Sequence, residues 1–227
     1  AMGEWPGKPA GDGLTEGWPS WAFENHDAPR AVSRWCSPED IDRFAPMKMA
    51  LLLSLRGNPI LYQGEELGLV QDEIPFEMLQ DPEAIANWPL TLSRDGARTP
   101  MPWREEAGGG FTTGNPWLPL SPANLARAVE KQKTDSTTLL GLTRKLLGLR
   151  SAHPALRHGA LEDLQVHGQL LEFTRSTVDE RIVARFNLSR EAIHQPGALP
   201  AGEALFAIND ATSADMPGYS AILLRGG

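Results

Sequence analysis

The chain has 227 residues, which is enough for one large domain or two modest ones. Its 21 Lys and Arg residues against 29 Asp and Glu residues give a net charge of −8, which argues against electrostatic binding of nucleic acid or of an anionic membrane. Hydrophobic residues make up 41% of the sequence, so a packed core is expected, and the apolar run at Ala50–Leu53 is too short to cross a membrane.

The single cysteine, Cys36, excludes an intrachain disulfide, and no Cys-x-x-Cys or Cys/His cluster suggests zinc. We therefore expect no metal ion and no cofactor. Residues 1–17 are rich in Gly and Pro and lack a basic region followed by an apolar stretch, so they do not resemble a signal peptide. Met2 follows Ala1, which favours a fragment or a processed product, and we expect a cytoplasmic location.

The first elements in chain order predict a strand, a helix and a second strand. Ser20–Phe23 is a short apolar run typical of a buried strand. Ser37 as N-cap and Pro38 at the first helical position predict a helix that ends at Gly57. Pro59–Tyr62 predicts a second buried strand, and strand–helix–strand order favours a parallel pair. The helix is expected to pack through Ile41, Phe44, Met47, Met49, Leu51, Leu52 and Leu55.

A long loop and two helices follow. The segment Gln71–Leu120 has no period and is far longer than a usual connection of about 4–6 residues, so it is predicted to be a loop that is either functional or disordered. One helix is predicted over Pro122–Gln132 and another from Ser136 to about His153. The second is expected to pack through Leu139, Leu140, Leu142, Leu146, Leu147 and Leu149.

From Gly159 the apolar period changes to two, which predicts strands. The strands expected are Leu170–Arg175, Arg181–Asn187, Gly202–Ile208 and Tyr219–Leu224, the first two joined as a hairpin. These strands predict a small antiparallel β domain.

Three polar clusters carry the candidate chemistry. Trp21-Ala22-Phe23-Glu24-Asn25-His26-Asp27 delivers Asn, His and Asp at the end of a buried strand, where α/β proteins build their sites. Gly57 to Gly68 is a second strand that ends in Gly64-Glu65-Glu66, and paired carboxylates suggest acid–base chemistry. Ser93-Arg94-Asp95-Gly96-Ala97-Arg98-Thr99-Pro100-Met101-Pro102-Trp103 offers arginine donors and a stacking Trp for a polar ligand. For each cluster taken alone, caps, turns or surface ion pairs remain an alternative.

In this order and spacing, the three motifs resemble the C-terminal part of α-glucosidases and oligo-1,6-glucosidases of the α-amylase superfamily, glycoside hydrolase family 13. The resemblance implies an α/β plus β fold. Residues 1–157 would be the C-terminal part of a (β/α)8 barrel, with about strands seven and eight and their helices. Residues 158–227 would be an antiparallel β-sandwich domain.

The resemblance also implies a retaining mechanism with a carboxylate nucleophile and a carboxylic acid. Asp27 matches the carboxylate that grips the 2- and 3-hydroxyls and stabilises the cation-like transition state. His26 matches a partner on the same hydroxyls, and Arg98 matches the arginine that reaches the 4-hydroxyl at the non-reducing end, which favours exo-action. Asn25 is expected to fix the strand end, and Glu65 matches a structural position.

Two departures from the family pattern matter. Glu24 stands where a small residue is expected, with either a neutral effect or a like-charge effect on Asp27. The family's nucleophile and acid lie on strands upstream of every motif in this chain. The chain alone is therefore expected to be inactive.

The expected partners are a small oligosaccharide, and either the missing N-terminal barrel portion or a second copy. The second copy is expected because the helix over Asp40–Leu55 should keep apolar surface that missing elements would cover. Three alternatives stay open: a transglycosylase of the sucrose isomerase or trehalose-forming type, a catalytically silent interaction subunit, and a carbohydrate-binding β module. The last is weakened because all seven Trp residues lie between Trp5 and Trp117.

Overall fold

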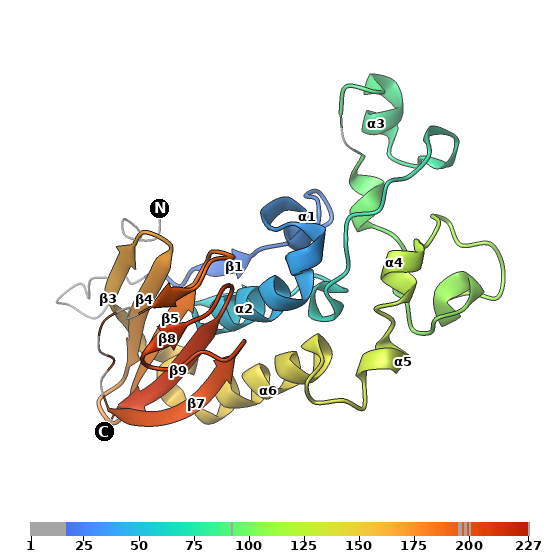
Figure 1. Cartoon of the computed structure of the whole chain (residues 1–227). Helices are drawn as coiled ribbons and strands as arrows, with labels where there is room; N and C mark the ends of the chain where they lie inside the picture. Colours follow the sequence, from blue (N-terminus) through green and yellow to red (C-terminus); the bar gives the residue numbers. More distant parts are fainter. Residues whose placement is uncertain (1–16, 92, 195–196, 198, 200, 227) are drawn as a thin grey trace. The chain divides into compact units, whose positions relative to one another are not determined.

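The computed structural model describes residues 17–91, 93–194, 197, 199 and 201–226. The Gly/Pro-rich segment before residue 17 therefore lies outside the described residues. The chain forms two compact units (Figure 1). The first takes its described residues from 1–21, 46–60 and 144–227, and the second from 22–45 and 61–143. Neither unit is one continuous stretch of the sequence, because the segments of the two units alternate along the chain. The domain boundary expected between residues 157 and 158 therefore stays a prediction.

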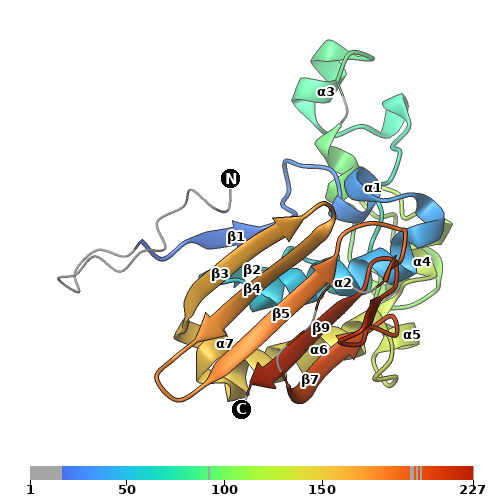
Figure 2. The same ribbon diagram turned by 60° about the vertical axis from the view of Figure 1, so that its left-hand side comes forward.

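The first unit is built on a five-stranded antiparallel sheet, as the change of period predicted (Figure 2). Its order is β3-β4-β5-β9-β7, with β3 Ala160–His167, β4 Leu170–Ser176, β5 Arg181–Asn187, β7 Gly202–Ile208 and β9 Ala221–Gly226. Strand β3 was not predicted from the sequence. The register of β3 shifts between Glu162 and Gln165, and this irregularity breaks the alternation on which strand prediction depends.

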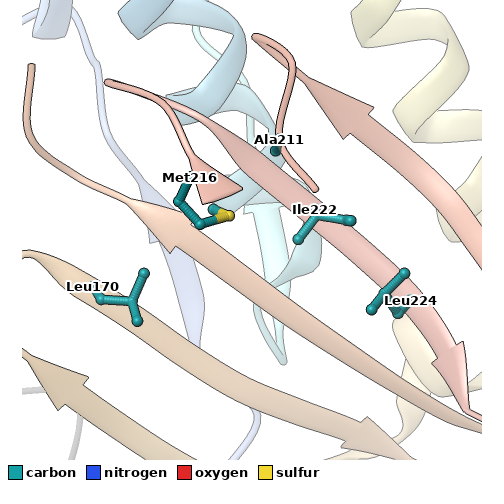
Figure 3. Packing of buried hydrophobic residues seen from close by; sticks show 5 residues of the cluster. All are labelled: Leu170, Ala211, Met216, Ile222 and Leu224. Carbon is teal, nitrogen blue, oxygen red and sulfur yellow. The ribbon is translucent and has the colours of Figure 1, made fainter. Parts of the chain in front are cut away.

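A core cluster of this unit joins the large sheet to a short second sheet, formed by β6 (Ile193–His194) paired with β8 (Asp215–Met216). Figure 3 shows five of its buried side chains, Leu170, Ala211, Met216, Ile222 and Leu224. On neighbouring strands β4 and β5, Phe173 and Phe186 stack with ring centroids 5.7 Å apart. Buried apolar side chains from the five-stranded sheet and from the β6–β8 pair therefore form the core of this unit.

Helix α6 (Leu139–Ala152) runs along the sheet, and Lys145 Nζ lies 5.4 Å from the ring centroid of Phe206 (Figure 2). Leu146 is buried, but Leu147 is 42% exposed, so the prediction that Leu147 packs is wrong. A further helix, α7 (Pro154–His158), was not predicted. Pro154 ends α6 and also occupies the first position of α7, where its missing N–H costs nothing.

The predicted first helix is α2 (Ile41–Ser54), preceded by a 3-10 turn, η2 (Pro38–Asp40). All seven residues expected to pack are at most 8% exposed. The expectation that this helix leaves apolar surface uncovered is therefore wrong. Ser37 occupies the N-cap, but its side chain makes no capping hydrogen bond among the described residues.

The two short strands β1 (Ser20–Ala22) and β2 (Asn58–Ile60) are neighbours in a two-stranded sheet. The backbone N of Asn58 donates to the carbonyl of Pro19 at 2.8 Å. Gly57, with φ +124°, is required here because a Cβ would lie 2.3 Å from that same carbonyl oxygen. The parallel direction of the pair stays a prediction.

The second unit contains the long connection, which holds more short helices than predicted. Within it and around it lie α1 Ala31–Trp35, η3 Glu65–Leu67, η4 Phe76–Met78, α3 Pro82–Asn87, η5 Arg94–Ala97, η6 Ala107–Gly110, α4 Pro122–Leu125 and α5 Val129–Gln132. The helix predicted over 122–132 is broken between α4 and α5, because Ala128 is extended and Val129 N donates to Pro102 O at 2.9 Å. No helix among the described residues is long and apolar enough to cross a bilayer.

One buried guanidinium joins the end of α2 to the start of the sheet. Arg175 donates to the carbonyls of Ser54, Gly159 and Ala160 at 2.7, 2.9 and 3.2 Å. Burial, with the positive charges of Arg150 and Arg56 nearby, lowers the pKa of Arg175 to about 9. The buried cation is tolerated because the carbonyls at the end of α2 and at the start of β3 accept hydrogen bonds from its N–H groups.

Replacing Arg175 tests this connection. Arg175→Met should lower the free energy of unfolding by about 2–4 kcal/mol, because buried carbonyl acceptors lose their donors. The control is Arg181→Met on β5, whose side chain is 52% exposed, with an expected effect of at most about 1 kcal/mol. Urea denaturation followed by circular dichroism gives both values, and equal losses in the two variants would contradict the assignment.

A partly buried contact between Glu180 and His153 supplies a pH dependence. Glu180 lies 2.5 Å from His153 Nδ1 and accepts a hydrogen bond from Ala155 N at the start of α7. Burial alone would raise the pKa of Glu180, but the hydrogen bonds from His153 and Ala155 together outweigh it, and the pKa is lowered. The carboxylate therefore stabilises the fold above its unfolded pKa of about 4.3.

As the pH falls through the lowered pKa of Glu180, this stabilisation should be lost. Glu180→Gln should be less stable than the unsubstituted protein at neutral pH, and the difference should shrink towards zero in acid. Thermal unfolding between neutral and acidic pH measures the difference. A constant gap between the two proteins across that range would show that the ionised carboxylate is not responsible.

Candidate functional site

The first polar motif follows β1 and turns sharply. The side chain of Asn25 accepts hydrogen bonds from Asp27 N at 2.8 Å and Ala28 N at 2.9 Å, an Asx turn. This turn leaves the side chains of His26 and Asp27 67% and 55% exposed. A short polar residue at position 25 thus presents the two candidate side chains to solvent.

Glu24 is fully engaged away from those side chains. Its Oε2 lies 3.1 Å from Arg30 Nη1, with both side chains 1% exposed, and its Oε1 accepts from Ala31 N at 3.1 Å. Of the two effects considered for Glu24, a neutral one fits this geometry better, since its charge is balanced by Arg30.

Arg30 is the central contact of this unit. Beyond Glu24, its guanidinium donates to the carbonyl of Gln63 at 2.6 Å and to that of Ala97 at 3.2 Å. It also lies 4.7 Å from the ring centroid of Tyr62, whose hydroxyl donates to Ala97 O at 3.0 Å. All three polar motifs are therefore tied to one buried cation.

The second motif is a structural turn. Glu65 is fully buried, and its Oε2 accepts from Tyr62 N at 3.1 Å. Gly64 has φ +84°, and a Cβ there would lie 2.3 Å from Leu69 Cδ1. With Glu65 closing its own turn, the paired carboxylates at 65 and 66 do not form an open acid–base pair.

The third motif brings Arg98 to the first. Arg98 Nη2 lies 2.9 Å from Asp27 Oδ1, and Arg98 Nε donates to the carbonyl of His26 at 2.8 Å. His26 Nε2 is 3.2 Å from Asp27 Oδ2. The three residues named from the sequence thus come together, although Asp27 and Arg98 are 71 positions apart.

Two further residues lie at this site: Arg94, one of the two arginine donors of the third motif, and Asp81, which was given no role from the sequence. Arg94 Nη1 lies 3.3 Å from Asp27 Oδ1, and the other edge of Arg94 forms a two-point pair with Asp81, at 2.6 and 2.9 Å. These hydrogen bonds from Arg94 hold the pKa of Asp81 far below its usual range, and the same pair raises the pKa of Arg94. Asp81 escaped notice because its local signal is that of the N-cap of α3, which it also is.

At this site the partly exposed carboxylate of Asp27 is contacted by the guanidinium groups of Arg94 and Arg98. Trp103, suggested from the sequence as a stacking residue, is 49% exposed. Among the described residues, no group of three His, Cys, Asp or Glu side chains is placed to hold a metal ion. The open carboxylate of Asp27, with fixed donors around it, is suited to binding a neutral polyhydroxyl ligand and to stabilising positive charge.

Comparisons with known proteins find relatives over most of the chain. Residues 11–159 match the family described as "Alpha amylase, catalytic domain". A probable alpha-glucosidase of Rhizobium meliloti is 46% identical over 178 residues, which cover 78% of this chain and 32% of the relative. A glucan 1,6-alpha-glucosidase of Streptococcus pneumoniae is 32% identical, covering 79% of this chain and 37% of the relative.

Solved structures give the same result. An alpha-glucosyl transfer enzyme is 41% identical with a TM-score of 0.84, covering 95% of this chain and 42% of its own. An isomaltulose synthase of Erwinia rhapontici, in complex with sucrose, is 25% identical with a TM-score of 0.81, covering 92% and 43%. The chain spans about a third of the length of the curated relatives.

The central role of Arg30 can be tested by Arg30→Lys. A single ammonium cannot replace a planar fork with several buried acceptors, so the free energy of unfolding should fall by about 3 kcal/mol or more. The matched control is Arg104→Lys, whose side chain is 65% exposed beside Glu106. Urea denaturation gives both values. A small loss in Arg30→Lys, equal to that of the control, would remove Arg30 from its central place.

Proposed function

The chain belongs to the α-amylase family, and from this premise we propose that it is the C-terminal part of a retaining, exo-acting α-glucosidase. The substrate would be a short oligosaccharide with a terminal α-linked glucose. The observation that carries the proposal is the convergence of Arg98 and His26 on the open carboxylate of Asp27.

In this proposal Asp27 accepts hydrogen bonds from two neighbouring hydroxyls of the glucose at the cleavage point. Its negative charge then stabilises the positive charge that develops at the anomeric carbon. His26 binds the same hydroxyls from the exposed side of the turn. Arg98 reaches the hydroxyl at the non-reducing end, which closes the site to longer chains on that side.

The double displacement needs two further carboxyl groups, which we assign to the upstream part of the barrel. In the first step one carboxylate attacks the anomeric carbon and forms a covalent glycosyl ester, while the other, as a carboxylic acid, protonates the leaving oxygen. In the second step that same acid, now a carboxylate, accepts a proton from the water molecule that hydrolyses the ester. Residues 1–157 would complete the barrel and residues 158–227 would form the appended β domain. The family match ending at residue 159 and the first strand of the large sheet at Ala160 support this boundary.

Transglycosylation is a second candidate, favoured by the likeness to a glucosyl transfer enzyme and to an isomaltulose synthase. Both activities use the same glycosyl ester and differ in whether water or a sugar hydroxyl attacks it. Product analysis with sucrose or maltose, at increasing acceptor concentration, separates them. Glucose release alone supports hydrolysis, whereas new disaccharides support transfer.

Asp27→Asn, in the enzyme that carries this chain, tests the proposed role. Turnover should fall on the order of 10²–10³-fold with little change in KM, because the lost charge acts mainly in the transition state. The control is Asp42→Asn, a carboxylate that is 84% exposed and paired with Arg127. Hydrolysis of nitrophenyl α-glucoside measures both variants, and near-normal turnover in Asp27→Asn would remove Asp27 from the mechanism.

The same assay addresses the need for an upstream half. The purified 227-residue chain should not hydrolyse nitrophenyl α-glucoside, and light scattering shows whether it associates. Turnover by this chain as a monomer would overturn the assignment of the nucleophile and acid to upstream residues.

A further inference from the structure

Asp27 Oδ1 is contacted by two guanidinium groups with different supports. Arg98 lies at 2.9 Å and Arg94 at 3.3 Å from the same oxygen. An exposed carboxylate gains little from one flexible surface cation, since holding both long side chains costs entropy. The two arginines differ in whether their side chains are also fixed from outside the site.

The side chain of Arg98, in the part of the chain that the structure describes, is anchored only within the site. Its two side-chain hydrogen bonds among the described residues go to the carbonyl of His26 and to Asp27. A ligand that takes over Asp27 also removes one of the two supports of Arg98. The carbonyl of His26 then remains as its support, so a smaller barrier opposes a turn of Arg98 towards the ligand.

Arg94 is anchored outside the site, on Asp81. Its Nε and Nη2 bind the two carboxylate oxygens of Asp81 at 2.9 and 2.6 Å, and its backbone N also donates to Asp81 at 3.1 Å. The side chain of Asp81 is fully buried, whereas that of Arg94 is 35% exposed. Two-point pairing of this kind fixes the plane of the guanidinium and leaves Nη1 to face Asp27.

Asp81 is itself held by a second buried carboxylate. Asp95 Oδ2 accepts from the backbone N of Gln80 at 2.7 Å and of Asp81 at 2.9 Å. The chain of contacts Asp95–Asp81–Arg94–Asp27 thus runs from the buried interior to the open site: both inner aspartates are buried, whereas the side chains of Arg94 and Asp27 are 35% and 55% exposed.

We propose that Asp81 and Arg94 are positioning residues for Asp27, an inference that rests on the proposed function. Arg94, locked by Asp81, holds the carboxylate of Asp27 in one orientation and balances its charge throughout the reaction. Arg98 is then able to leave Asp27 for the sugar without freeing it. Neither Asp81 nor Arg94 needs to touch the substrate for this.

The test uses Asp81→Asn in the enzyme that carries this chain. Asn keeps the size of the side chain and the ability to cap α3, but it removes the charge that locks Arg94. Turnover should fall about 10- to 100-fold, as for a misplaced catalytic group, while KM changes less than about 3-fold. The matched control, Asp42→Asn, breaks another Asp–Arg pair and should leave both constants unchanged.

Arg94→Lys provides a second variant that leaves Asp81 intact. Lysine keeps a cation beside Asp81 but, as a point donor, cannot hold both carboxylates in a fixed geometry. It should show the same fall in turnover, and the double variant should be no slower than the slower single variant, since both break one connection. Thermal unfolding of each variant, together with circular dichroism, establishes that the compared proteins are folded.

The outcomes separate the two proposals. Normal turnover in folded Asp81→Asn or Arg94→Lys, a rise in KM alone, or additive losses in the double variant would each overturn the positioning role while the glucosidase assignment stands. An unsubstituted enzyme without turnover on any α-glucoside would overturn the proposed function, and the positioning role with it. A fall in turnover confined to the variants at 81 and 94 supports both.

Discussion

The buried guanidinium of Arg30 is the interaction on which the site depends. Its partners are the carboxylate of Glu24 and the carbonyls of Gln63 and Ala97, one from each polar motif. A buried cation without partners would be prohibitively costly, so all three segments must be in place together when this arginine is enclosed. The local stability of the unit and the geometry of the site are therefore set by the same contacts.

The charged side chains that lead to Asp27 differ in how exposed they are. Asp95 and Asp81 are buried and each accepts hydrogen bonds, Arg94 is intermediate, and Asp27 is open. Flexible residues at a surface rarely hold a productive geometry unless something rigid orients them. The position of Asp27 is accordingly determined below the surface, and the exposed side chains are left free to meet a ligand.

Much of the fold could be predicted from periodicity, because α2, β4 and β5 bury regular sets of apolar side chains. The pairing of Asp27 with Arg98 was predicted through the resemblance of the motifs. Asp81 was not, because its local pattern is that of a helix cap and nothing in the sequence marks its partner thirteen positions later. The same limit applies to β3, where a register shift hides the alternation, and to the break at Ala128, which an acceptor from residue 102 determines.

The reach of Arg175 to the end of α2 has a consequence for how this protein can change over evolution. The donor lies on β4, and its acceptor Ser54 lies 121 positions earlier. A β domain exchanged with that of a distant relative, or cut away after residue 158, would take the arginine and leave its buried acceptor behind. Separating the sheet from α2 would therefore leave a buried carbonyl without its donor, and a recombinant chain would need a compensating donor at this position.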